Sequence, residues 1–165
     1  MTAGATYVPI ATQTLGTAAA TVTFSSIPGT YTDLELVVSY QGTSTGANLY
    51  PNGDGTANKS YTGLRGNGTT ADSNRASNSV AIQDYVTTST NASGEFTVSK
   101  FYVFNYANTT TYKTVLVKKS EASAYVEALV GTHRITTAIT SLQVSSASGN
   151  FAVGSTFTLY GIAAA

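Results

Sequence analysis

Apolar and polar side chains alternate along many short segments of this chain, and turn-forming residues separate the segments. In 20–25 the alternation places Val22 and Phe24 on one face, and Asp33–Gln41 has the same pattern. A period of two residues is typical of a strand with one buried face. No segment carries a convincing helical stripe beyond a possible turn near 121–125. The chain is therefore expected to be all-β.

The other strand candidates share this alternation: Thr6–Leu15, Ala47–Tyr50, Tyr61–Arg65, Val80–Tyr85, Glu95–Ala107, Tyr112–Ser120, Ala124–Thr132, Ile139–Ser145 and Ser155–Ile162. Gly66–Asn78 has almost no apolar residues, and we expect a long functional or mobile loop there. Short strands at this spacing predict a two-sheet antiparallel β-sandwich over residues 1–165, jelly-roll-like, although the pattern leaves other sandwich topologies open. Residues 1–10 are expected to form an N-terminal arm that orders on contact with a neighbour.

Glu95–Ala107 is the strongest strand candidate, and apolar residues occupy both of its faces from Phe101 to Phe104. A strand buried on both faces contacts a second layer or another subunit. Three tyrosines, Tyr102, Tyr106 and Tyr112, cluster around the turn that follows. Tyrosine anchors interfaces at low entropic cost. The candidate interface residues are therefore Phe101, Tyr102, Val103, Phe104, Tyr106 and Tyr112.

The composition supports a β protein with an uncharged polar surface. The 165 residues include 29 Thr and 18 Ser, whereas charged residues make up only 10%. Thr is β-branched and favours strands, and hydroxyl groups keep a surface wet without charge. The eight basic and eight acidic residues cancel, which disfavours nucleic-acid binding and permits self-association.

Two further features limit the class of protein. The chain has no cysteine, which excludes disulfides and thiolate metal sites. It has neither an apolar run long enough for a membrane span nor a signal-peptide pattern at Met1–Gly4, so we expect synthesis in the cytoplasm and no membrane partner.

The sequence gives little support for catalysis or metal binding. His133 is the only histidine, and no nucleophile motif accompanies it, so a structural ring is the favoured interpretation. Asp33 and Glu35 flank Leu34 on the expected solvent face of a strand. Asn52–Gly55 (NGDG) contains calcium-type oxygen ligands but fits a tight turn better, and Asp54→Ala is expected to leave folding unchanged. We expect no enzyme activity, cofactor or metal.

Several segments resemble small virion proteins of tailed bacteriophages. The segments that carry the resemblance are Tyr7–Ala11, Val22–Pro28, Tyr31–Leu34, Asn52–Asp54, Ile135–Leu142, Ser148–Phe151 and above all Gly154–Ile162 (GSTFTLYGI). The resemblance implies β-sandwich virion parts without enzymatic activity, often trimers, in capsid decoration, tails or fibres. It identifies no functional residue that carries over to this chain.

These observations favour a capsid decoration (cement) protein, made in the host cytoplasm and located in the virion. Its expected partners are further copies of itself, with a trimer favoured, and the major capsid protein or other virion proteins. The alternative is a tail-fibre or receptor-binding component that recognises surface glycans through the loops at Gly42–Asn78 and Thr87–Gly94. A depolymerase ranks third because no convincing acid pair is present. Phe104→Ala is expected to cost ~3 kcal/mol or more through lost core or interface packing.

Overall fold

The computed structural model describes residues 6–42, 46–84, 95–121 and 125–163, and all regular elements in these ranges are strands. The strands are β1 (Tyr7–Thr14), β2 (Thr21–Phe24), β3 (Asp33–Tyr40), β4 (Ala47–Pro51), β5 (Lys59–Gly66), β6 (Ala71–Ser79), β7 (Ile82–Gln83), β8 (Thr97–Phe104), β9 (Lys113–Glu121), β10 (Val126–His133), β11 (Leu142–Ser146) and β12 (Thr156–Ile162).

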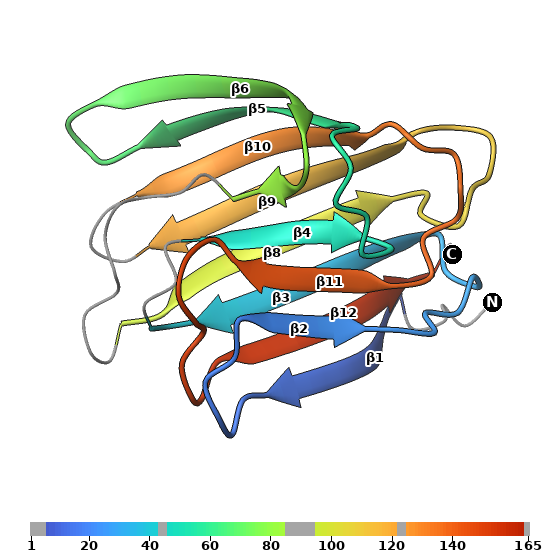
Figure 1. The fold of residues 1–165 in the computed structure, drawn as a ribbon, viewed down its shortest axis with the longest axis horizontal. Helices are drawn as coiled ribbons and strands as arrows, with labels where there is room; N and C mark the ends of the chain where they lie inside the picture. The colour runs from blue at the N-terminus through green and yellow to red at the C-terminus, as the bar shows by residue number, and fades with distance from the viewer. Residues whose placement is uncertain (1–5, 43–45, 85–94, 122–124, 164–165) are drawn as a thin grey trace.

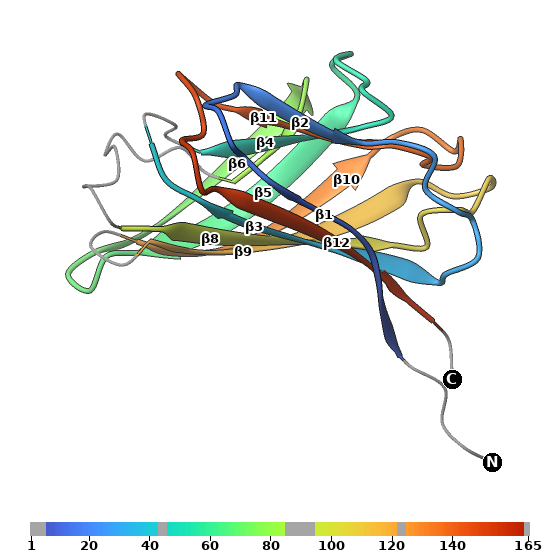
Figure 2. The same cartoon turned by 90° about the horizontal axis from the view of Figure 1, so that it is seen from below.

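The strands form two antiparallel sheets that pack face to face (Figures 1 and 2). The large sheet has eight strands in the order β1-β12-β3-β8-β9-β10-β5-β6, and the small sheet has four in the order β2-β11-β4-β7. The all-β fold and the two antiparallel layers are therefore confirmed. The small sheet covers the large sheet as far as β10 and β5, which β7 contacts, while β6 extends beyond it (Figure 1).

Side chains that alternate into the space between the layers form the core. On β3 the residues at every second position, from Leu34 to Tyr40, are buried against the small sheet. Phe151 lies between Tyr40 and Phe157, with ring centroids 5.4 and 5.1 Å away and edge-to-face geometry. Such aromatic pairs add about 0.5–1.5 kcal/mol each beyond the area they bury. The core therefore fixes the register of β3, and with it the direction of every outward side chain.

Most strand predictions agree with the structure, but Gly66–Asn78 is wrong as a long loop. Residues Ala71–Ser79 form β6, a polar edge strand that pairs with β5 along its full length. Its sequence has no apolar alternation because most of its side chains are exposed on both faces. The expected N-terminal arm also differs: β1 begins at Tyr7 and pairs with β12, while residues 1–5 lie outside the described ranges.

The two faces of β8 have different environments. Phe101 and Val103 are fully buried between the sheets, whereas Tyr102 and Phe104 point the other way and are half-buried. No described element covers that outer side of the large sheet, as the edge-on view shows (Figure 2). We call this outer side the open face.

Candidate functional site

The register of the large sheet places one row of side chains across the open face. Tyr160 on β12 lies opposite Glu35, Glu35 opposite Tyr102, and Tyr102 opposite Leu116. The row continues through Val130 and Thr62 to Arg75 on β6. Residues directly opposite in an antiparallel pair lie on the same face, with Cβ atoms about 5 Å apart. The open face is thus aromatic at one end, apolar in the middle and basic at the far end.

The middle of this face exposes apolar side chains that have no second layer. We call this group the apolar stripe; its members are Leu64, Leu116, Val126, Ala128 and Val130. Leu64 is 64% exposed, Val126 62% and Val130 51%. A shallow hollow of about 380 Å³ lies over Leu64, Leu116, Ala128 and Val130. Contiguous exposed apolar surface on a folded protein marks an interaction site or an aggregation hazard.

The aromatic end contains a carboxylate that is buried on the open face. Glu35 is only 3% exposed, and Lys100 Nζ donates to its Oε1 at 2.9 Å. A hydrogen bond to Glu35 and the charge of that carboxylate raise the pKa of Tyr7, whose ring meets Tyr160 edge to face at 6.3 Å. The same carboxylate raises the pKa of Lys100, because the hydrogen bond favours the ammonium form. These contacts attach the edge strand β1 to the rest of the sheet.

The six candidate interface residues divide between the core and the surface. Phe101, Val103 and Tyr106 are fully buried within this chain and do not present side chains to a partner. Tyr106 donates its hydroxyl hydrogen to the Pro28 carbonyl, so it joins two loops. Tyr102 and Phe104 lie half-buried on the open face, and Tyr112 is 57% exposed. The interface therefore stays a prediction, and on β8 only the face that carries Tyr102 and Phe104 is open to a partner.

The sequence analysis missed the apolar stripe, although a signal for it was present. In Val126–His133 the exposed face of the strand carries Val126, Ala128 and Val130, while Leu129 lies on the buried face. Apolar residues on both faces of this strand resemble the pattern that drew attention to Phe101–Phe104. Leu64 and Leu116 could not be added from the sequence, because only the pairing of β5 and β9 with β10 places them beside Val130.

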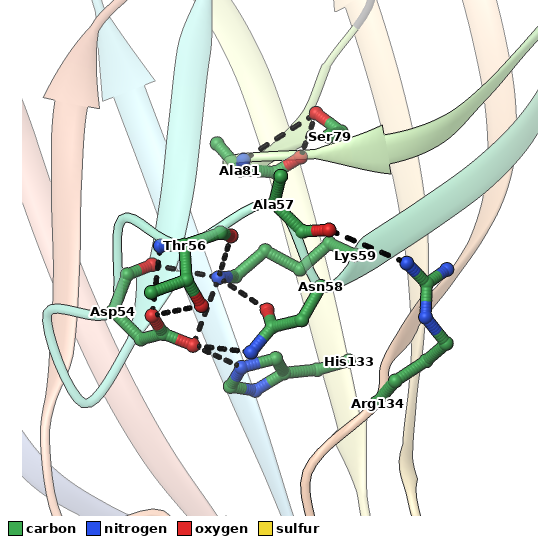
Figure 3. Close-up of polar contacts among 9 residues, drawn as sticks. All are labelled: Asp54, Thr56, Ala57, Asn58, Lys59, Ser79, Ala81, His133 and Arg134. Carbon is green, nitrogen blue, oxygen red and sulfur yellow. Dashed lines mark hydrogen bonds and ion pairs between the residues drawn. The ribbon is translucent and has the colours of Figure 1, made fainter.

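A second polar cluster lies where β4 and β5 are connected (Figure 3). Asp54 in this loop accepts a hydrogen bond from His133 on β10, with Nε2 and Oδ2 2.9 Å apart. Asp54 also accepts from the backbone and hydroxyl of Thr56 at 2.8 and 2.7 Å, and from Asn58 Nδ2 at 2.8 Å. Lys59 Nζ lies 3.1 Å from Oδ2 and is fully buried. These contacts fix the conformation of the whole loop.

Two buried lysines flank His133 and hold neighbouring loops. His133 pairs with Lys59 on β5 and with Lys113 on β9, so the three side chains share the inward face. Lys59 donates to the carbonyls of Asp54 and Thr56, and Lys113 donates to the carbonyls of Asn108, Thr111 and Thr136. Buried ammonium groups need such partners because desolvation is costly. The lysines therefore act as anchors for the loops at this end of the sheet.

The charges of this cluster are set by burial and by hydrogen bonds. Burial lowers the pKa of His133, and the neighbouring Lys59 and Lys113 lower it further, while Asp54 opposes them. Burial disfavours the ionised form of Asp54, but hydrogen bonds from His133, Thr56 and Asn58 outweigh it and hold its pKa well below the usual range. His133 is therefore a neutral ring that donates from Nε2 to an ionised carboxylate.

The contacts of this cluster hold the β4–β5 loop against the end of β10. His133 Nδ1 is buried and has no hydrogen-bond partner, so no described hydroxyl is positioned for activation by the ring. Nor do three His, Asp or Glu side chains of the described ranges come together as metal ligands. These contacts argue against the expectation that Asp54→Ala leaves folding almost unchanged, because this carboxylate accepts hydrogen bonds from four groups and balances a buried lysine.

No protein-family model matches this chain, and no curated protein matches it either. The described residues contain no helix with the length and apolar character needed to cross a membrane.

Proposed function

We propose that this protein is a structural component of a bacteriophage virion, specifically a capsid decoration protein that attaches to the assembled shell through the open face. The apolar stripe carries the proposal, since its three most exposed side chains are each more than half exposed on the uncovered side of the sheet. Burying a Val or Leu side chain contributes about 1.5–3 kcal/mol relative to leaving it in water. A subunit that covered this face would therefore gain substantial free energy of binding.

The strand order within the two packed sheets supports a jelly-roll topology. Four strands of the large sheet, in the order β1-β12-β3-β8, pack over the small sheet, whose order is β2-β11-β4-β7. The connections β1–β2, β3–β4, β7–β8 and β11–β12 each cross from one sheet to the other. The hairpins β5–β6 and β9–β10 then enlarge one sheet of this arrangement. Jelly rolls are common in viral capsid proteins and in lectins.

The resemblance of the terminal segments to phage virion proteins adds a second line of support, with a trimer as the proposed state on the shell. The near absence of net charge is compatible with many copies packed side by side. In this proposal the protein is made in the host cytoplasm and then joins the virion.

One observation favours a receptor-binding component as a second candidate function. Tyr7, Tyr102 and Tyr160 lie on the open face around the Glu35–Lys100 ion pair, and Tyr7 is 51% exposed. Tyrosine rings next to hydrogen-bonding groups are suited to stacking on sugars. Of the loops expected to bind glycans, Thr87–Gly94 lies outside the described residues.

Copy number separates the two candidates. Quantitative mass spectrometry of purified particles would compare this chain with the major shell protein. A copy number of the same order as that of the shell protein supports a decoration protein, and a few copies per particle support a tail-fibre or receptor-binding component. Absence from the particle would overturn both virion roles.

A binding experiment then tests whether the protein attaches to the shell through the open face. Shells assembled without the protein would be titrated with the wild type and with Leu64→Thr/Val130→Thr. Each introduced hydroxyl would be buried without a partner, so affinity should fall at least tenfold. Val153→Thr is the matched control, because Val153 is 54% exposed but lies in a turn away from the open face. Equal binding by all three proteins would contradict attachment through the stripe.

A further inference from the structure

The half of the open face formed by β9, β10, β5 and β6 has charges of one sign only. Lys118 on β9 pairs with Ala128, and Ala128 pairs with Leu64. In the adjacent row Val130 pairs with Thr62 on β5, and Thr62 pairs with Arg75 on β6. Lys118 and Arg75 therefore lie on opposite sides of the apolar stripe. Three inter-strand steps separate β9 from β6, which corresponds to about 14 Å across the sheet.

The carboxylates of these four strands all lie on the other side of the sheet. Glu121 and Glu127 are buried and alternate inward with Val117 and Leu129. Asp72 pairs with Arg65, which alternates with the inward residues of β5 and binds Asp72 at 2.7 and 2.9 Å. Among the described residues of β9, β10, β5 and β6, the open face consequently carries cations without carboxylates.

Both cations are available for a partner. Lys118 and Arg75 are exposed, and neither forms an ion pair or hydrogen bond with another described residue. Lys100, on the neighbouring strand β8, differs because Glu35 neutralises it. An unpaired cation beside an apolar surface gains most from a partner carboxylate once water has been removed, because the attraction strengthens as the local dielectric falls.

We propose, on the basis of the function proposed above, that this half of the open face binds an acidic and apolar protein surface. The partner inserts apolar side chains over the apolar stripe and places carboxylates near Lys118 and Arg75. A second copy bound through the same half would bring like charges together with no carboxylate between them, which is costly in a desolvated interface. Two cations are also too few to track a phosphate backbone, where specific proteins commonly neutralise several charges.

The charge component can be tested separately from the apolar one. Shells assembled without the protein would be titrated with wild type and with Lys118→Gln/Arg75→Gln at 50 and 500 mM salt. We expect wild-type affinity to fall about tenfold between the two salt concentrations, and the variant to bind about tenfold more weakly at low salt with little further salt response. The melting temperature should not change, because neither side chain has a partner within the described part of the chain.

Val153→Glu/Gln13→Glu is the matched control. It makes the same change in net charge at two exposed positions that lie off the open face. Wild-type binding by this control would show that the position of the charges matters. Two results together would overturn the proposal that the partner surface is acidic: wild-type affinity that does not depend on salt, and the same affinity for Lys118→Gln/Arg75→Gln. If Leu64→Thr/Val130→Thr still bound weakly in that case, attachment through the stripe would stand. Failure of wild type to bind shells at all would overturn the decoration function as well.

Discussion

His133 and Asp54 are 79 residues apart in the sequence, yet Nε2 of the ring lies 2.9 Å from Oδ2 of the carboxylate. The contact joins the end of β10 to the β4–β5 loop, and Nζ of the fully buried Lys59 lies 3.1 Å from the same carboxylate oxygen. Together with the lysine anchors, it defines the loop geometry at one end of the sandwich. Its consequences are open to measurement.

Asp54→Ala should lower the free energy of unfolding by about 2–4 kcal/mol. The substitution leaves the buried Lys59 ammonium without its counter-charge and removes an acceptor from His133, Thr56 and Asn58. Urea unfolding followed by fluorescence would measure it. Asp72→Ala is the control, because Asp72 is 49% exposed in its pair with Arg65 and should cost no more than about 1 kcal/mol. Similar losses for the two variants would contradict the role of Asp54.

Stability should decrease as the pH falls below about 6.5, where histidine takes up a proton in the unfolded chain. The pKa of His133 is lowered in the folded protein, so between the folded and unfolded values the unfolded state binds the additional proton. Stability is therefore complete above the unfolded pKa and lost as the pH falls toward the folded value. Asp54, whose pKa is also lowered, extends the loss below the usual carboxylate range near 4.

Unfolding free energies at pH 7.5 and pH 5 would test this pH dependence. One proton contributes at most about 1.4 kcal/mol per pH unit. Because His133 is the only histidine, His133→Gln should flatten the dependence between pH 7.5 and 5. An unchanged slope in His133→Gln would mean that another group titrates in this range.

Phe101→Ala and Phe104→Ala should differ strongly in stability. Phe101 is fully buried, and its truncation should cost about 3–5 kcal/mol. Phe104 is half-buried on the open face, so we expect about 1 kcal/mol in place of the larger loss expected from the sequence. Thermal or urea unfolding of the two variants measures the contrast. If Phe104→Ala lost more stability than Phe101→Ala, the core would lie on the face of β8 that carries Phe104, contrary to the structure.

Gly161→Ala should destabilise the protein by about 1–3 kcal/mol, although the change adds one methyl group. A Cβ at this position would lie only 2.4–2.6 Å from ring atoms of Tyr31, at the base of the ring where the side chain cannot bend away. Gly161, the second glycine of the GSTFTLYGI segment, is thus required by close packing. Tyr31→Ala should relieve the clash, so that Gly161→Ala costs less in the Tyr31→Ala background. An equal cost in both backgrounds would assign the effect to the backbone.

The sequence by itself determined the strands that have one buried face. Alternation fixed β2, β3 and β12 closely, because a period of two residues reports directly which side chains avoid water. The same signal was missing for β6, whose polar residues are exposed on both faces and whose strand conformation depends on backbone pairing with β5. Local sequence carries no information on such pairing.

For a strand with apolar residues on both faces, only the tertiary structure decided which face is buried, and it alone decided which distant residues meet. Apolar residues on both sides of Phe101–Phe104 predicted contacts, but the small sheet covers Phe101 and leaves Phe104 on the open face. The apolar stripe arises from the pairing of β5, β9 and β10, and the Asp54–His133 contact from the packing of a loop against a strand end. Alternation specifies a face within one strand, whereas the order of strands in a sheet depends on long-range packing that no single segment encodes.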